Sequence, residues 1–383
     1  MENLINTFLS NQKNNNLLRT LKNITSQKNG LITAEGKEYI NFSSNDYLGL
    51  ASHPALEQAL TNEIEDGIGT CSSRLMTGTS SHHLDLEKKI ARLKHKESAL
   101  IFNSGYQANL GIISALAREK DCVFSDKLNH ASIIDGVKLS GSKLIRFNHN
   151  DPEHLEYLIE KNKAKYNNLF VVTESVFSMD GDIAPIKEII DLKEKHGFCF
   201  ILDEAHATGV FGPDGMGIAD TKKISKHIDI VMGTFSKALA GFGAYVCSSR
   251  ETRDFLINKA RSFIYSTSLP IPIIKLNSKA LDLIKEEPNR RIGVLRKAEK
   301  LRKGLRGVGL NVIGESQIVP IIIGDTEKTL ELVKELKERG YWVMPIRKPT
   351  VPINEARIRI SVTYDHKDEI IEKFIKDIGN LVK

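Results

Sequence analysis

The stretch Phe198-Cys-Phe-Ile-Leu-Asp203-Glu-Ala-His206 indicates the fold class, because a short apolar run ends there in an acidic residue. The apolar part has the length and composition of a buried strand. Further runs of this kind occupy residues 99–102, 121–124, 143–147, 168–172, 228–232 and 244–247. Most stretches between them repeat apolar residues at helical spacing. This alternation predicts an α/β fold with a mostly parallel sheet that helices cover on both faces.

A second segment, Thr234-Phe-Ser-Lys237, follows the run at 228–232 and precedes a glycine-bearing loop. A lysine in such a setting can form a Schiff base with an aldehyde, while nearby hydroxyl and backbone N–H groups hold a phosphate. These are the two contacts that pyridoxal phosphate (PLP) needs. Taken alone, Lys237 could equally be a lysine of a surface loop.

Asp203 and His206 strengthen the PLP interpretation. Ligands of open α/β sheets bind beyond the carboxyl ends of the strands, where both residues are expected. An aspartate facing the pyridine nitrogen of PLP keeps it protonated, so the ring can accept the electrons of a carbanion. His206 could hydrogen-bond the phenolic oxygen. Singly, Asp203 could cap a turn and His206 could be satisfied locally, but Asp203 and Lys237 at successive strand ends favour a cofactor site.

A series of motifs runs from about residue 18 to the C-terminus. They are Asn41-Phe-Ser-Ser-Asn45-Asp-Tyr-Leu-Gly-Leu50, Gly69-Thr-Cys-Ser-Ser-Arg74-Leu-Met-Thr-Gly-Thr79, Asn103-Ser-Gly-Tyr106, Asp126-Lys-Leu-Asn-His130-Ala-Ser, Glu174-Ser-Val-Phe-Ser178-Met-Asp-Gly-Asp182, Asp203-Glu-Ala-His206, Thr234-Phe-Ser-Lys237 and Pro349-Thr-Val-Pro352. In this order they resemble the α-oxoamine synthases. The resemblance implies a fold-type I PLP-dependent transferase, with a large sheet domain and a smaller C-terminal α+β domain.

The resemblance, together with the residue types, gives an expected cofactor site. His130 is expected to stack on the ring, and the helix start at 104–106 is expected to hold the phosphate. Without the family, these would be a helix-start histidine and an ordinary strand-to-helix turn. The expected catalytic residues are Lys237, His130, Asp203 and His206. The expected cofactor-binding residues are these four with Ser104, Gly105, Tyr106, Ser178, Thr234, Ser236, Ser266 and Thr267.

Arg347 is the expected substrate-binding cation, because it lies in a proline-stiffened loop at 345–352. A fixed guanidinium can bind an amino-acid carboxylate through two hydrogen bonds. Without the family, a solvated loop arginine would be the plainer interpretation. Family substrate positions also match Arg19, Asn45, Arg74 and Thr350. No metal site is expected, and the His82-His83 pair is interpreted as surface or interface.

The resemblance is strongest to the member that condenses L-alanine with a pimeloyl thioester in a homodimer with shared active sites, where Ser266 and Thr267 reach the partner's cofactor phosphate. Members that use glycine, 2-amino-3-ketobutyrate ligase and 5-aminolevulinate synthase, are the second interpretation, and serine palmitoyltransferase is the third. An aminotransferase or aldolase-type lyase would share Asp203 and Lys237 without needing a thioester. A non-catalytic relative would be expected to lack Lys237.

The composition sets further limits. The chain of 383 residues is expected to divide into an N-terminal arm (1–42), a large PLP-binding domain (43–270) and a small domain (271–383). The net charge of +6 is spread along the chain, which predicts a solvated surface rather than a nucleic-acid interface. The four cysteines lack CxxC spacing, so neither zinc nor disulfides are predicted.

No apolar run approaches the roughly 18 residues that span a bilayer, and residues 1–16 lack a signal peptide's apolar segment. A cytoplasmic location without a membrane partner is therefore expected. Locally, the sequence predicts a helix around 4–21, a hairpin turning at Glu35-Gly36, and a long helical stretch from residue 273 that Pro288 breaks.

Overall fold

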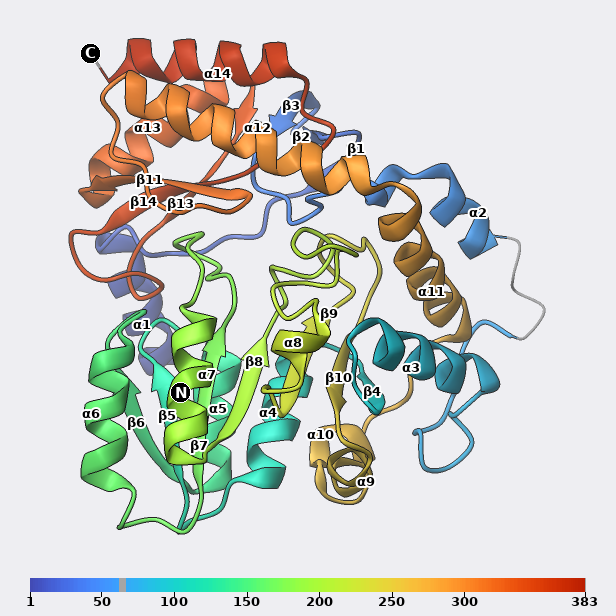
Figure 1. Ribbon diagram of the computed structural model, residues 1–383. Helices are drawn as coiled ribbons and strands as arrows, with labels where there is room; N and C mark the ends of the chain where they lie inside the picture. Colours follow the sequence, from blue (N-terminus) through green and yellow to red (C-terminus); the bar gives the residue numbers. More distant parts are fainter. Residues whose placement is uncertain (62–66, 383) are drawn as a thin grey trace. The chain divides into compact units, whose positions relative to one another are not determined.

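The computed structural model describes residues 1–61 and 67–382 (Figure 1). The chain forms two compact units. The larger unit contains Leu50–Ser178 and Ile183–Ile292, and the smaller contains Met1–Gly49, Met179–Asp182 and Gly293–Lys383. The division at residues 42 and 270 stays a prediction about independent domains. Within the described part of the chain, no helix has the length and apolar character needed to span a membrane.

The larger unit is built on a seven-stranded sheet with the order β4-β10-β9-β8-β7-β5-β6. β10 runs antiparallel to both of its neighbours, and the remaining pairs are parallel. The strands are β4 (Ser98–Phe102), β5 (Cys122–Asp126), β6 (Lys143–Phe147), β7 (Leu169–Glu174), β8 (Cys199–Asp203), β9 (Ile230–Thr234) and β10 (Ala244–Ser248). The expected mostly parallel sheet is confirmed, with a single antiparallel strand inserted.

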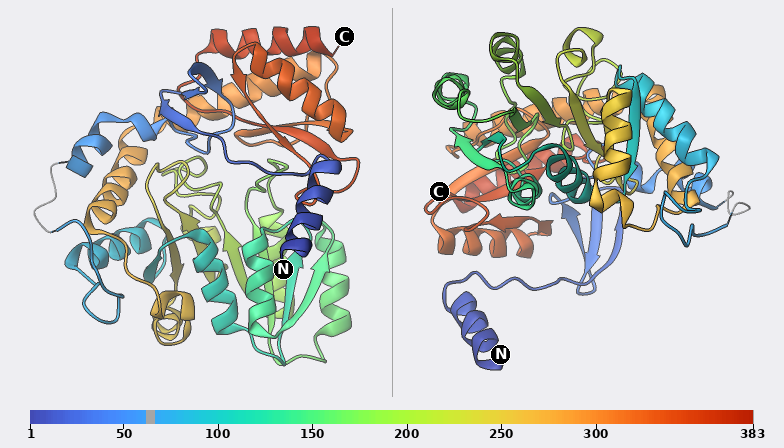
Figure 2. Two further views of the ribbon diagram at one scale, coloured as in Figure 1. Left: turned by 180° about the vertical axis from the view of Figure 1, so that it is seen from behind. Right: turned by 90° about the horizontal axis from the view of Figure 1, so that it is seen from below.

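Helices cover both faces of this sheet (Figure 2). One face of the strands packs against α4 and α5, where Val172, Ile201 and Met232 share an apolar core with Ile112 and Ile133. Side chains alternate between the two faces, so each strand supplies a second apolar set to the opposite side. The helices are η1 (Leu50–Ser52), α2 (Pro54–Thr61), α3 (Ser81–Leu93), α4 (Gly105–Leu116), α5 (Ala131–Ser140), α6 (Pro152–Asn162), α7 (Ile186–His196), α8 (Lys222–Ser225), α9 (Arg250–Lys259), α10 (Arg261–Ile264) and α11 (Ile271–Glu286).

The smaller unit contains two sheets, with the orders β1-β2-β3-β12 and β11-β14-β13. β12 pairs parallel with β3, so the N-terminal segment and the C-terminal part share one sheet. The strands are β1 (Ile24–Lys28), β2 (Leu31–Ala34), β3 (Lys37–Asn41), β11 (Ile318–Gly324), β12 (Tyr341–Trp342), β13 (Met344–Ile346) and β14 (Ala356–Ser361). The helices are α1 (Glu2–Asn14), α13 (Thr326–Glu338), α14 (Asp368–Leu381) and the part of α12 (Pro288–Gly307) from Gly293 onward.

Three local predictions meet different outcomes. The hairpin is confirmed: Glu35 and Gly36 adopt φ values of 54° and 73° between β2 and β3, the left-handed pair that a tight hairpin turn requires. The break at Pro288 is also confirmed, because α11 ends at Glu286 and α12 begins with this proline. The helix expected to reach residue 21 is shorter and ends at Asn14, since Asn16 takes a left-handed conformation that a helix cannot continue through.

Candidate active site

Asp203 lies at the carboxyl end of β8 and is buried. Its Oδ2 atom accepts a hydrogen bond from Nδ2 of Asn109 at 2.8 Å, and its Oδ1 atom accepts one from the backbone N–H of Ala205 at 2.8 Å. Each oxygen of the carboxyl group therefore has a protein donor. The expected partner for a protonated ring nitrogen is therefore held in one orientation by the protein itself.

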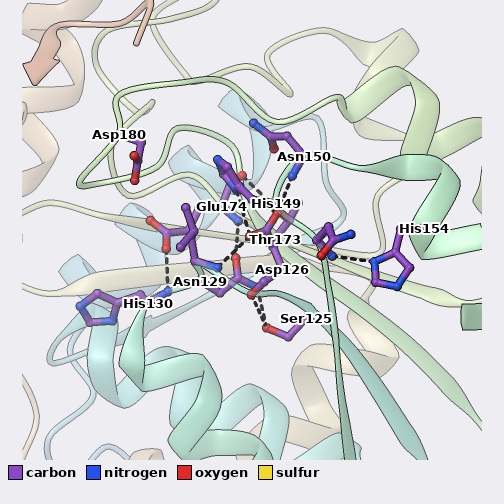
Figure 3. Close-up of polar contacts among 12 residues, drawn as sticks. Ser125, Asp126, Asn129, His130, His149, Asn150, His154, Thr173, Glu174 and Asp180 are labelled. Atoms are coloured by element: carbon purple, nitrogen blue, oxygen red, sulfur yellow. Dashed lines mark hydrogen bonds and ion pairs between the residues drawn. The ribbon is translucent and has the colours of Figure 1, made fainter. Parts of the chain in front are cut away.

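His130 caps the N-terminus of α5 and is anchored on two sides. Its backbone N–H donates to Oε1 of Glu174 at 2.6 Å, as Figure 3 shows, and its Nδ1 atom lies 2.8 Å from Oγ of Ser132. Partial burial lowers the pKa of His130, while Asp203 acts to raise it and Lys237 to lower it further. The structure thus places His130, Asp203 and Lys237 within electrostatic reach of one another.

Glu174 is a site residue to which the sequence analysis gave no role. It ends β7 as the register partner of Asp203, and its backbone N–H donates to Oδ1 of Asn129 at 3.1 Å (Figure 3). Burial, reinforced by Asp203, raises the pKa of Glu174 to about 8, against the opposing effect of the His130 N–H. The side chain is therefore largely neutral at pH 7. A glutamate ending an apolar strand beside another acidic strand end is the sequence signal for it.

The residues expected around the phosphate come together at two element ends. Ser104 caps α4, and its Oγ atom accepts from the backbone N–H of Gln107 at 3.2 Å. A Cβ atom on Gly105 would lie 2.8 Å from Cγ2 of Thr234, the last residue of β9. The N-terminus of α4 and the carboxyl end of β9 therefore adjoin, and a helix N-terminus favours an anion.

The remaining cofactor candidates are distributed around these groups. His206 is buried in the turn after β8, and Ser178 is half-buried after β7. Tyr106 is exposed, and its hydroxyl donates to Asp135. Lys237 is half-buried and Ser236 exposed, just beyond β9.

Together these residues fit PLP. The structure supplies a hydrogen-bonded carboxyl acceptor for the ring nitrogen, an aromatic side chain and a lysine near it, and a helix N-terminus that adjoins Thr234 through a glycine. Asp203, His130, Lys237, Gly105 and Thr234 would hold the cofactor. Each of these assignments stays a prediction at the level of the single residue.

Arg19 and Arg347 lie close to each other in the smaller unit. Nη2 of Arg19 donates to Oγ1 of Thr350 at 3.3 Å, and Nη2 of Arg347 donates to the carbonyl oxygen of Leu18 at 3.4 Å. Burial lowers the pKa of Arg347, and the charge of Arg19 lowers it further. Among the described residues neither guanidinium forms an ion pair with a carboxylate, so the two like charges form a candidate anion site.

Arg359, on β14, is a second cation that the sequence analysis missed. It is buried, and its Nη2 atom donates to Oδ1 of Asn45 and to the hydroxyl of Tyr47, each at 3.2 Å. Its Nη1 atom donates to Oγ of Ser361 at 2.7 Å. Asn45 was expected near the substrate, so Arg359 is a further candidate for binding a carboxylate. The signal was an arginine inside an apolar strand, where a charge needs a partner.

Three other expected positions have local partners in the larger unit. The Arg74 guanidinium pairs with Oε1 of Glu87 at 2.9 Å and is largely buried. Oγ of Ser266 donates to the carbonyl oxygen of Ser262 at 2.7 Å, and the carbonyl oxygen of Thr267 accepts from Asn103 at 2.6 Å. Their roles toward substrate and partner subunit stay predictions.

One expectation is wrong: His83 is not a surface residue. It is fully buried in α3, where its Nε2 atom lies 2.9 Å from Oγ of Ser268, and burial lowers its pKa to about 4. Its backbone N–H also donates to Oγ of Ser80, which caps the helix, so His83 has a structural place in the fold.

Comparisons with known proteins agree with this site. The chain matches the family described as aminotransferase class I and II over residues 37–378. It is 42% identical to an 8-amino-7-oxononanoate synthase from Geobacter sulfurreducens over 371 residues, covering 96% of this chain and 95% of the relative. A protein of the same name from Pelobacter propionicus is 44% identical over 360 residues, covering 92% and 91%.

Solved structures give the same result. A serine palmitoyltransferase from Sphingomonas wittichii superposes with a TM-score of 0.91 at 29% identity, covering 98% of this chain and 96% of the other. A structure named as SPT with PLP reaches 0.92 at 28% identity, with the same coverage. An 8-amino-7-oxononanoate synthase from Francisella tularensis reaches 0.79 at 29% identity, covering 90% and 98%.

These comparisons confirm the expected fold-type I architecture and the expected cofactor, PLP. The chain belongs to the aminotransferase class I and II family and, within it, to the PLP-dependent acyltransferases that resemble 8-amino-7-oxononanoate synthase.

Proposed function

We propose that the chain condenses L-alanine with a pimeloyl thioester and releases 8-amino-7-oxononanoate, the free thiol and carbon dioxide. Its near-full-length similarity to proteins named for that product supports the reaction. The observation that carries the chemistry is the buried, doubly hydrogen-bonded Asp203 within electrostatic reach of His130, which Lys237 also influences.

Bound PLP supplies an electron-accepting ring that stabilises negative charge on the α-carbon of the amino acid. Lys237 would hold the cofactor, and its amine would act as the base that takes the α-proton of the substrate. Asp203 would provide the negative charge that keeps the ring nitrogen protonated, and His130 would lie against the ring. The N–H groups at the start of α4 and the hydroxyl of Thr234 bind the phosphate.

The two substrates together bring two carboxylates, one on alanine and one at the far end of the pimeloyl chain. The smaller unit offers a guanidinium at two places, Arg359 beside Asn45 and the neighbouring pair Arg19 and Arg347. We assign Arg359 and Asn45 to the alanine carboxylate and the pair, with Thr350, to the pimeloyl carboxylate. This moves Arg347 from the amino acid to the acyl substrate.

We further propose a cytoplasmic homodimer with shared active sites, in which Ser266 and Thr267 reach the partner's cofactor phosphate. The exposure of Thr267 is compatible with such a contact. One chain has a mass of 42.8 kDa, and light scattering should give twice that value. A monomer that retains full activity would contradict the shared site.

Serine palmitoyltransferase activity is the second candidate, because solved structures of that name superpose with TM-scores near 0.91. The identity to them is 29%, however, against 42% to the Geobacter relative.

The test is thiol release by the purified, PLP-loaded chain with three substrate pairs: L-alanine with pimeloyl-CoA, glycine with acetyl-CoA, and L-serine with palmitoyl-CoA. Release with the first pair only, and a product with the mass of 8-amino-7-oxononanoate, is the expected result. Release with another pair only would overturn the substrate assignment. Transamination of L-alanine without thiol release would overturn the acyltransferase reaction.

A further inference from the structure

Asn109 and Ser132 connect the two groups expected to flank the cofactor ring. Asn109 lies one turn into α4 and Ser132 in the first turn of α5, and both side chains are buried. Nδ2 of Asn109 donates to Oδ2 of Asp203 at 2.8 Å and to Oγ of Ser132 at 3.1 Å. Oγ of Ser132 lies 2.8 Å from Nδ1 of His130. A continuous chain of hydrogen bonds therefore joins Asp203 to His130.

The packing of α4 on α5 makes this connection possible. Gly136 of α5 faces α4 so closely that an added Cβ atom would lie 3.1 Å from the carbonyl oxygen of Asn109. A larger residue there would force the helices apart and lengthen the contact between Asn109 and Ser132. The glycine thus sets the distance that the chain of hydrogen bonds needs.

The hydrogen bonds fix the direction of each donor. The amide of Asn109 must turn its N–H groups toward Asp203, because its oxygen would otherwise meet a carboxylate. As a consequence its Oδ1 atom is buried with no hydrogen-bond partner in the described part of the chain. Such an orphaned acceptor is costly and persists only where the other contacts outweigh it. The orientation of Asn109 toward Asp203 therefore dominates this part of the core.

Ser132 determines which ring nitrogen of His130 carries the proton. Because its Oγ atom accepts from Asn109, its own hydrogen is free to donate to Nδ1 of His130. Its backbone N–H also donates to Nδ1, at 3.3 Å. Two donors converge on Nδ1, so the neutral imidazole carries its proton on Nε2.

We propose that Asn109 and Ser132 are positioning residues that act through a single hydrogen-bonded chain. They hold Asp203 as an oriented carboxylate and His130 as the neutral tautomer protonated on Nε2. A neutral ring suits the face of a protonated pyridine, whereas an imidazolium would place a second positive charge against it. The inference rests on the PLP site of the proposed function and concerns two residues that are hydrogen-bonded to Asp203 and His130.

Several charged groups surround His130 and are part of the same balance. Asp203 and Asp135 favour its protonation, Lys237 opposes it, and Glu174 is held largely neutral by burial. Burial is the largest cause of the lowered His130 pKa, and the two donors at Nδ1 add to it by favouring the neutral ring. Removing them should therefore change the titration of His130 in a known direction.

The test uses nitrogen-15 NMR of histidine-labelled, cofactor-free protein, which distinguishes the two neutral tautomers and gives the pKa of His130. We expect the Nε2-protonated form in the wild type. Asn109→Ala should raise the pKa of His130 although Asn109 does not touch it, because the released hydroxyl of Ser132 can then accept from Nδ1–H. Ser132→Ala should raise it as well, and the double variant should show no further rise.

The affinity for PLP is a second measurement that tests the same series of hydrogen bonds. Asn109→Ala should weaken PLP about tenfold, the usual loss for one hydrogen bond to a charged group. Asn109→Asp keeps the volume but sets a second carboxyl against Asp203, so its loss should be larger. Asn162→Ala is the matched control, a buried amide on α6 that donates to the carbonyl oxygen of Leu158 at 2.7 Å. It should leave both the His130 pKa and PLP affinity unchanged.

Two outcomes would overturn the inference: an Nδ1-protonated His130 in the wild type, or a His130 pKa that Asn109→Ala leaves unchanged. If Asn109→Ala does not fold, Ser132→Ala alone decides, because it removes the hydroxyl donor without enlarging the core. Both measurements are made without substrate. A failure here is therefore distinguishable from a failure of the thiol-release assay, which tests the reaction itself.

Discussion

The two units treat charge in opposite ways. In the larger unit, Asp203 has a protein donor on each oxygen, and the neighbouring carboxyl of Glu174 is held largely neutral. In the smaller unit, burial and then the nearby charge of Arg19 lower the pKa of Arg347, and no carboxylate is paired to either guanidinium among the described residues. In the larger unit the charged carboxyl group has protein partners, whereas in the smaller unit the two guanidinium groups have no carboxylate partner among the described residues.

This difference matches two kinds of ligand. A resident cofactor benefits from groups that are already oriented, because no reorganisation is then needed during the reaction. A substrate that enters and leaves as an anion can itself supply the missing charge, and its departure restores the repulsion. Variants in the larger unit should therefore damage chemistry and stability, whereas variants in the smaller unit should damage substrate binding.

The largest expected effect comes from Lys237→Ala in the larger unit. Loss of the group that moves the α-proton should lower the rate of thiol release by about 10²–10⁴-fold. Borohydride treatment should no longer attach the cofactor to the chain, as mass spectrometry of the intact protein would reveal. Lys259→Ala, at the exposed end of α9, should behave as the wild type. Covalent attachment that survived in Lys237→Ala would reassign the lysine.

Breaking the buried pair Lys94–Glu204 should produce the next largest effect, on stability. Both side chains are fully buried, and Nζ of Lys94 lies 2.5 Å from Oε2 of Glu204. Lys94→Met would leave the buried carboxylate of Glu204 uncompensated, and we expect the unfolding free energy to fall by about 3–5 kcal/mol. Urea unfolding measures this. Lys88→Ala removes an exposed pair with Asp85 and should cost less than about 1 kcal/mol.

Arginine variants in the smaller unit should separate the two carboxylates. Arg347→Ala should raise the KM for pimeloyl-CoA about 10–100-fold with little change in kcat, because it removes a charge-assisted contact made equally in the ground and transition states. Arg359→Ala should instead raise the KM for L-alanine. Lys348→Ala in the same loop is the control. If Arg347→Ala lowers kcat and leaves both KM values unchanged, the claim that the smaller unit acts in substrate binding is contradicted.

Residues at strand ends could be predicted from the sequence, because chain order and the period of the strands fix where a parallel strand stops. Asp203 and Thr234 lie where the apolar runs predicted them, and Lys237 follows directly. The hairpin at Glu35-Gly36 followed from local backbone preference. These features depend on near neighbours in the chain, which a single sequence contains in full.

Contacts between distant segments could not be predicted in this way. Asn109, Ser132 and Asp203 meet only because α4 packs on α5 above the sheet, and nothing in their local sequence specifies that packing. Arg359 approaches Asn45 across 314 positions of the chain. His83 was expected at a surface or an interface, yet tertiary packing buries it. Burial decides the charge state of such groups, and burial is a property of the fold.

Glu174 gives a pH-dependent effect that tests this point directly. Its folded-state pKa, raised to about 8 from 4.5, means that the folded chain binds this proton more tightly than the unfolded chain. Between these pH values, stability should therefore fall as pH rises, by at most about 1.4 kcal/mol per pH unit for one proton. Glu174→Gln keeps an oxygen for the N–H of His130 but does not titrate.

The cofactor-free wild type and Glu174→Gln should thus have similar urea midpoints near pH 5, and the variant should gain relative stability as pH approaches 8. Parallel pH profiles would mean that Glu174 titrates normally, and that the larger unit tolerates two ionised carboxylates at adjacent strand ends. In that case the two units would no longer differ in this respect, because uncompensated like charges would occur in both. A diverging profile instead attributes the neutral state of Glu174 to its burial beside Asp203, the condition that keeps a single negative charge for the cofactor ring.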